Sequence, residues 1–345
     1  MAADMSDNTP LTDDGSDQRD DELDARIHRA DVDDLIRLID ARTAQRDWPG
    51  ILRTRNRARA AVDSGRQLWP VATLAEYRLA LWASDEWCAT VLDEESGRLT
   101  IGPLSEVAAV HHTWAGLGQL LSPGPTATYF AHERSLRGEQ IPREDAHQLV
   151  KVIDVPVDLQ AWEPHYEVAT YDDDGVHVDR PTMGVDMAAI ALPSHFEVIE
   201  DDESEAAFRQ LVDVWIERSN GRAELVCVEG DIEHAIAATG ARKARASRIT
   251  AAEGLSVLAW AGSSGGAHGR RRGSAVGRFG AWWFAAALVD DNRWPPKADA
   301  FGDAVNALEW WMWDAFEPDT GWSLRLAIAS PDDGLAWACA ATDVA

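Results

Sequence analysis

Apolar residues in the first third of the chain recur every three or four positions. Leu23 and Ile27 begin the series, and Val32, Leu35 and Ile39 continue it. This spacing is typical of amphipathic helices, in which one turn takes about 3.6 residues. We therefore expect an all-α N-terminal domain of antiparallel helices over residues 21–122. Its other predicted helices cover residues 51–62, 71–92 and 103–121.

From residue 195 onward, short apolar runs alternate with helical patterns. Thr250 and Glu253 form a capping box, in which the two side chains satisfy free N–H groups at the start of a helix. Alternating strands and helices are typical of an α/β domain with a mostly parallel sheet and flanking helices, here predicted over residues 195–345. The predicted strands cover residues 195–199, 223–228, 245–249 and 322–329, and the predicted helices 204–218, 231–239, 251–261, 269–289, 299–316 and 330–341.

Two segments fit neither pattern. Residues 1–20 are rich in Asp, Ser, Thr and Gly with almost no large apolar side chains, which predicts a disordered acidic tail. Residues 123–194 contain one short helix candidate and strand-like runs near 166–178. We interpret this second segment as an irregular, strand-containing connector between the two domains.

Charge is distributed unevenly along the chain. The whole chain carries a formal charge of −27, yet residues 241–280 contain eight basic side chains and one acid. This island therefore has a net charge of +7, and the rest of the chain carries −34. A cationic island on a strongly anionic protein indicates a local role for positive charge, because solubility alone does not require one.

The overall charge also limits the classes of partner. A strongly negative protein repels nucleic-acid phosphates and anionic membranes, so neither is an expected partner. The longest apolar run, residues 281–289, is far too short to cross a bilayer. The histidine-containing pairs have spacing that does not predict a metal site. Three cysteines lie far apart in apolar surroundings, which favours buried free thiols in a reducing cytoplasm. They are Cys88, Cys227 and Cys339.

The sharpest candidate for chemistry is the Gly- and Arg-rich segment 262–278. Glycines let a backbone approach a ligand closely, and the N-terminus of a following helix offers free N–H groups to an anion. Arginines add bidentate contacts to phosphate or carboxylate, and a histidine can titrate beside them. The segment is neither a P-loop nor a dinucleotide fingerprint, because a helix precedes it where those motifs need a strand. The predicted anion-binding residues are Gly266, His268, Gly269, Arg270, Arg271, Arg272 and Arg278.

The same glycines allow a purely structural interpretation. Gly269, Gly273, Gly277 and Ala281 stand four positions apart, so they would form a smooth stripe along one helix face. Such a stripe lets a neighbouring helix or sheet pack very close, with the arginines flanking the contact and pairing with acids elsewhere. Both interpretations remain open at this point because the glycine face and the Arg271–Arg278 face differ.

A second candidate is aromatic. If residues 299–316 form one helix, Trp310 and Trp313 fall outside its apolar stripe. Exposed indoles are costly unless another domain covers them or a partner contacts them. The two tryptophans are therefore either buried at a domain interface or part of an interaction surface.

Two functional hypotheses follow. The first is a small-anion-binding or regulatory protein that holds a phosphate or carboxylate at residues 262–278. The second is a non-enzymatic interaction module whose acidic surface meets a basic protein partner and whose exposed Trp side chains anchor the contact. No nucleophile–base pair can be named from the sequence, so enzymatic activity stays undecided and no cofactor is indicated.

Overall fold

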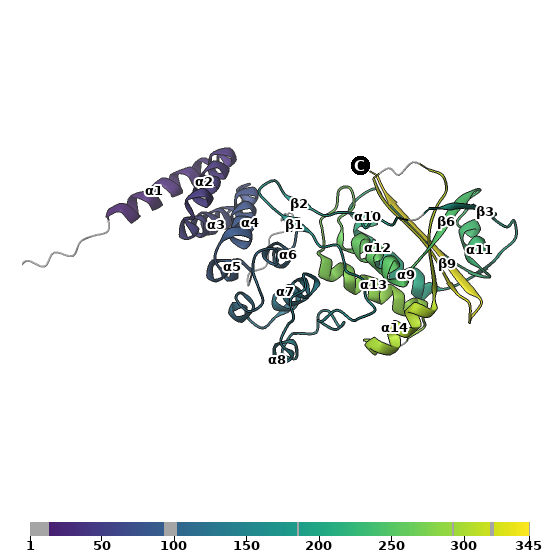
Figure 1. The fold of residues 1–345 in the computed structure, drawn as a ribbon. Helices are drawn as coiled ribbons and strands as arrows, with labels where there is room; N and C mark the ends of the chain where they lie inside the picture. The colour runs from purple at the N-terminus through teal and green to yellow at the C-terminus, as the bar shows by residue number, and fades with distance from the viewer. Residues whose placement is uncertain (1–13, 93–101, 185, 292, 318–320, 345) are drawn as a thin grey trace, which may run out of the picture.

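The computed structural model of the protein describes residues 14–92, 102–184, 186–291, 293–317 and 321–344. It consists of a helical region, containing α1 to α8, and a sheet region built on a seven-stranded sheet. The two regions lie side by side, with α7 packed against α13, and the first helices extend away from the sheet (Figure 1). Residues 1–13 of the predicted tail lie outside the described residues, and α1 begins at Asp14.

The helical region buries the apolar stripes that the sequence pattern predicts. Leu35 and Ile39 of α2 are fully buried in one shared core. Asp47 caps α3 by accepting a hydrogen bond from the Gly50 N–H, and a proline occupies the first turn. The predicted helix over residues 71–92 is divided into two, and the one over 103–121 is much shorter than expected. The elements are α1 (Asp14–Arg29), α2 (Val32–Gln45), α3 (Trp48–Asp63), α4 (Trp69–Trp82), α5 (Asp85–Leu92), α6 (Leu104–Ala108), the 3-10 helix η1 (Gly118–Leu120), α7 (Pro125–Leu136) and α8 (Arg143–Ala146).

The sheet is antiparallel throughout, so the predicted mostly parallel α/β sheet is wrong. Its strand order is β3-β6-β7-β8-β9-β5-β4. Consecutive strands β7, β8 and β9 form a meander in the middle and separate β5 from β6, so the helix between those two strands does not connect parallel neighbours. The strands are β3 (Ala188–Ile190), β4 (Glu197–Ile199), β5 (Arg222–Glu229), β6 (Ala244–Ile249), β7 (Glu309–Asp314), β8 (Trp322–Ser330) and β9 (Leu335–Asp343), with a separate hairpin of β1 (Thr170–Tyr171) and β2 (Val176–His177).

Two strands lie where helices were predicted. The helix predicted over residues 299–316 ends at Ala307, and the following residues pair with β6 and β8 as strand β7. The helix predicted over residues 330–341 is strand β9. Ser330 and Asp333, which resemble a capping box, instead join their side chains at 2.6 Å in the turn between β8 and β9.

Helices cover both faces of the sheet, as Figure 1 shows. One face packs against α9 (Asp202–Leu211), α12 (Ala251–Ser263) and α13 (Ser274–Leu288), and α14 (Ala298–Ala307) joins the same core. The short α11 (Ile232–Ala238) lies on the other face, over alanines of β8 and β9. Small side chains there let α11 approach the sheet closely, which explains an alanine-rich strand. The remaining helix, α10 (Asp213–Glu217), follows α9 directly.

Several local predictions are confirmed. Thr250 and Glu253 form the capping box at the start of α12. Cys88, Cys227 and Cys339 are buried free thiols. The glycine stripe is a packing feature where it enters α13, because Gly277 lies against the α12 backbone.

Replacing Gly277 with alanine is expected to lower the free energy of unfolding by about 1–3 kcal/mol, as overpacking in a tight core does. A Cβ at this position would lie 2.1 Å from the Ala259 carbonyl oxygen, which is backbone and cannot move aside cheaply. Gly280→Ala on the same helix is the matched control, since its Cβ would meet only the flexible end of Leu211. Urea denaturation measures both variants, and equal stability of the two would contradict the packing argument.

Candidate functional site

The glycine-rich loop between α12 and α13 contacts an anionic group, and that group is the Asp343 side chain of the protein itself. The Ala267 N–H donates to one carboxylate oxygen of Asp343 at 2.6 Å, and the Ser219 hydroxyl donates to the other at 2.7 Å. Asp343 is fully buried at the end of β9. Gly266 lies so close that a side-chain carbon there would be 2.3 Å from the same carboxylate. A side chain at position 266 would therefore collide with Asp343, so the loop needs a glycine there for this internal contact.

Arg271 joins the two regions of the molecule. Its Nε and Nη2 each lie 2.8 Å from one oxygen of Glu106, which comes from α6 in the helical region. The Tyr171 hydroxyl donates to the same carboxylate at 2.6 Å. Burial alone would raise the pKa of Glu106, but Arg271 and Tyr171 hold it at about 2. Arg271 is thus part of a buried, charged junction.

The N-terminus of α13 also binds internal carboxylates. The Ser274 N–H donates to Glu106 at 2.9 Å, and the Ala275 N–H donates to Glu133 of α7 at 2.7 Å. Arg137 pairs with Glu133 at 2.6 Å. Burial and the neighbouring Glu106 nevertheless raise the pKa of Glu133 to about 7. The free N–H groups predicted to hold a ligand therefore hold two side chains of the helical region.

Arg278 is engaged in the same way. Its Nε and Nη2 lie 2.7 Å and 2.6 Å from the two oxygens of Glu163, and its Nη1 donates to the Pro156 carbonyl at 2.7 Å. Both charged side chains are almost completely buried. Burial would lower the pKa of Arg278, but Glu163 raises it above its ordinary value. Arg271 and Arg278 do not share a ligand-facing surface, because Arg271 precedes α13 and points to α6.

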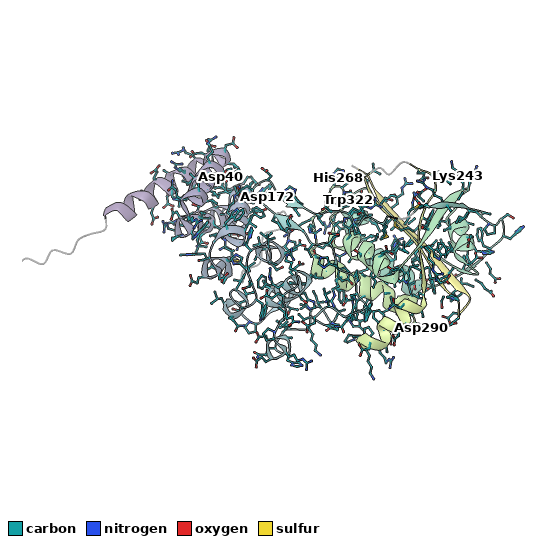
Figure 2. The ribbon with its side chains drawn as sticks, in the orientation of Figure 1. Asp40, Asp172, Lys243, His268, Asp290 and Trp322 are labelled. Atoms are coloured by element: carbon teal, nitrogen blue, oxygen red, sulfur yellow. The ribbon has the colours of Figure 1, made fainter. Side chains whose placement is uncertain are left out.

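The rest of the predicted segment borders an open cleft, which we call the arginine cleft. Its volume is about 800 Å³, and none of the described residues that line it is acidic. His268 is exposed on the loop, which Figure 2 shows at the same end of the sheet region as Trp322. The lining residues are Pro103, Val214, Arg218, His268, Gly269, Arg270, Arg271 and Arg272.

The arginines of the cleft differ in how they are held. Arg272 pairs with Asp213 at 2.8 Å and donates to the Leu211 carbonyl at 3.2 Å. Arg270 is partly buried, and this burial lowers the pKa of its guanidinium below the ordinary value. Arg218 is exposed, directly after α10. In the cleft, Arg271 and Arg272 are thus paired with internal acids, and the guanidinium groups of Arg218 and Arg270 lie around them.

Trp310 and Trp313 do not lie at the surface. Trp310 is 1 % exposed and packs on α12 at Gly254, and Trp313 is 4 % exposed in the core under α11. Each indole N–H donates to a backbone carbonyl, that of Val305 for Trp310 and that of Leu326 for Trp313, both at 3.1 Å. Both indoles are therefore core side chains, and neither can anchor a partner.

Sequence reasoning missed the acids of distant segments that contact residues of the arginine island. Glu106, Glu133 and Glu163 lie more than a hundred residues before their partners in the sheet region. A local signal does exist for Glu106, which stands within the otherwise uncharged run 103–110. A carboxylate in such a run is rarely buried without a partner. The sequence also gave no reason to add Arg218 to the predicted site.

Among the described residues, no group of three or more His, Cys, Asp or Glu side chains is placed to hold a metal ion. None of the helices described is both long and apolar enough to cross a membrane.

Together, the fold and the site define a two-region protein in which Glu106 and Glu133 of a helical region bind Arg271 and the N-terminus of α13 in an antiparallel sheet region. The chain belongs to the family of unknown function DUF6183, whose family model matches residues 33–345. Comparisons of the chain with curated proteins and with solved structures gave no match.

Proposed function

We propose that the protein binds a small anion, carrying a phosphate or carboxylate group, in the arginine cleft. The observation that supports this function is a solvent-accessible hollow bordered by four arginines and a histidine, with no acid among its described lining residues. Arg218 and Arg270 supply the contacts to the ligand. Arg271 and Arg272 fix the wall behind them, since both are held by internal acids.

Electrostatics favours this role for the cleft. A concave surface of one charge sign focuses the potential and raises the local concentration of ions of the opposite sign. Guanidinium groups contact phosphate and carboxylate oxygens through paired N–H donors, which adds geometric selection to charge. The surrounding acidic surface repels large polyanions, so a small ligand fits better than a nucleic acid.

The cleft supports binding rather than catalysis. Of its described lining side chains, only that of His268 is of a kind that commonly acts as a general acid or base, and no Ser, Cys, Asp or Glu is among them to serve as nucleophile or orienting group. Burial of Trp310 and Trp313 removes the two named anchors of the interaction-module hypothesis, so we do not propose that function.

Isothermal titration calorimetry with inorganic phosphate, pyrophosphate and citrate tests the proposal on the full chain at low ionic strength. The double variant Arg218→Ala/Arg270→Ala is expected to lose at least tenfold in affinity, because a hydrogen bond to a charged group contributes about 1.5–3 kcal/mol. Higher salt is expected to weaken binding to the unaltered protein.

The matched control is Arg248→Ala/Arg293→Ala, which removes the same charge from two exposed sites outside the cleft lining. This control variant is expected to bind the anions as the unaltered protein does. Equal losses in both double variants, or no heat of binding for any of the three anions at millimolar concentration, would reject the proposed function.

A further inference from the structure

A second cavity lies between the helical region and residues 295–296, and it has a different chemistry. Its volume is about 330 Å³. One wall is α7, which contributes Thr128 and His132 one turn apart. The opposite wall is the segment 146–157, whose lining side chains are mostly apolar, and Pro295 and Pro296 close one side. We call this cavity the His132 pocket.

His132 is the unusual group in this pocket. The residue is 1 % exposed, and its Nδ1 atom is buried without a hydrogen-bond partner. Buried polar atoms almost always have partners, and one that lacks them is destabilising until something supplies the missing hydrogen bond. Burial, with a smaller contribution from Arg278, lowers the pKa of His132 to about 3, so the ring is neutral at physiological pH.

Three polar side chains near His132 are already hydrogen-bonded or exposed to solvent. The Thr128 hydroxyl donates to the Val150 carbonyl at 2.8 Å, so it fixes the far wall to α7. Lys151 and His147 are exposed at the rim. Arg278 lies behind the wall, where it donates to the Pro156 carbonyl and is neutralised by Glu163. Asp154 also lines the pocket and is half-buried, so the pocket combines mostly apolar walls with the neutral His132 ring and one acidic side chain, opposite in charge to Lys151.

We propose that the His132 pocket binds an uncharged small molecule with an apolar body and one hydroxyl or carbonyl group, which forms a hydrogen bond with the His132 ring. Clefts or cavities with mostly apolar walls and a small number of placed polar groups are the usual form of small-molecule sites. An ionic ligand is disfavoured because the two charged lining residues, Lys151 and Asp154, are of opposite sign, so the pocket offers no net charge to offset the ligand's loss of hydration. This site is independent of the arginine cleft.

The test compares phenol with toluene, two molecules of nearly the same shape that differ in a hydroxyl and a methyl group. Binding to the full chain is followed by NMR of the histidine side-chain nitrogens, with an affinity from the titration. Phenol is expected to bind at least tenfold more tightly than toluene and to shift the His132 ring nitrogens. No binding of phenol up to its solubility limit, or binding without a shift at His132, would overturn the proposal.

His132→Phe separates a ligand role from a structural one. The phenylalanine ring keeps the bulk but removes the unpartnered nitrogen, so the variant is expected to fold with equal or higher stability. Its preference for phenol over toluene is expected to disappear. An unchanged preference would overturn the proposal, and if the variant does not fold, the nitrogen shifts of the unaltered protein still decide the question. Phosphate binding in the arginine cleft should be the same in this variant, so the two proposals fail separately.

Discussion

Replacing Arg278 with methionine is expected to lower the free energy of unfolding by about 3–5 kcal/mol at pH 7, because it leaves a buried charge without its counter-ion. Arg278 and Glu163 side chains are 1 % and 0 % exposed. The other partners of Glu163 are uncharged, the Tyr166 hydroxyl at 2.8 Å and the Trp282 indole at 2.9 Å. Urea denaturation followed by tryptophan fluorescence measures the loss.

A double variant shows whether the loss comes from the pair. Arg278→Met/Glu163→Leu removes both charges, so it is expected to be more stable than Arg278→Met alone despite the additional substitution. Arg248→Met is the surface control, since Arg248 is 61 % exposed in its pair with Glu309 and exposed pairs contribute about 0–1 kcal/mol. If the losses of the single variants Arg278→Met and Glu163→Leu simply add in the double variant, the two side chains are not coupled and the argument is wrong.

The helices of this protein could be predicted where the signal is local. Thr250 with Glu253 marks a helix start that the structure confirms, and the predicted helix over residues 51–62 lies within α3. These signals depend on residues within four positions of each other, so no tertiary information is needed to interpret them. The same is true of the buried stripe at Leu35 and Ile39.

The strands β7 and β9 could not be predicted in this way. The apolar spacing of α14 continues into residues 309–314, but pairing with β6 and β8 outweighs it and places Trp310 and Trp313 on opposite faces of the sheet. In β9, alanine favours a helix in isolation, yet Ala336 and Ala338 are small because α11 packs over them. Once these two strands are taken as helices, a parallel sheet follows wrongly from the remaining alternation.

The candidate site, too, could be predicted from the sequence only in part. In residues 262–278, the loop, the helix N-terminus and the arginines contact carboxylates of the protein itself, so the binding of an external anion stays a prediction. The identity of most of those anions was not predictable, because Glu106, Glu133 and Glu163 are distant in sequence. What remains of the predicted site is the part that lines the arginine cleft, with Arg218 added from α10's end.

Stability near neutral pH is expected to depend on Glu133. Its pKa is about 7 in the folded protein, against an ordinary value of 4.5, because of burial and the adjacent Glu106. A carboxyl with a raised pKa binds more protons in the folded state than in the unfolded state. Protonated Glu133 therefore adds about 3 kcal/mol to the free energy of unfolding below pH 4.5, and this contribution is lost as the pH rises through 7. Glu106 acts in the opposite direction, and its contribution is lost only as the pH falls from 4.5 towards 2.

Glu133→Gln tests this directly, because glutamine resembles the protonated acid and keeps an acceptor for the Ala275 N–H. Urea denaturation from pH 5 to pH 8.5 is expected to give similar stabilities at pH 5 and a more stable variant at the alkaline end. Groups such as His132 also titrate, but they are common to both proteins and cancel in the difference. Glu205→Gln, at an exposed position on α9, should follow the unaltered protein at every pH. A Glu133→Gln curve parallel to that of the unaltered protein would mean that Arg137 and the α13 N-terminus keep Glu133 fully ionised, and that the junction between the two regions is not sensitive to pH.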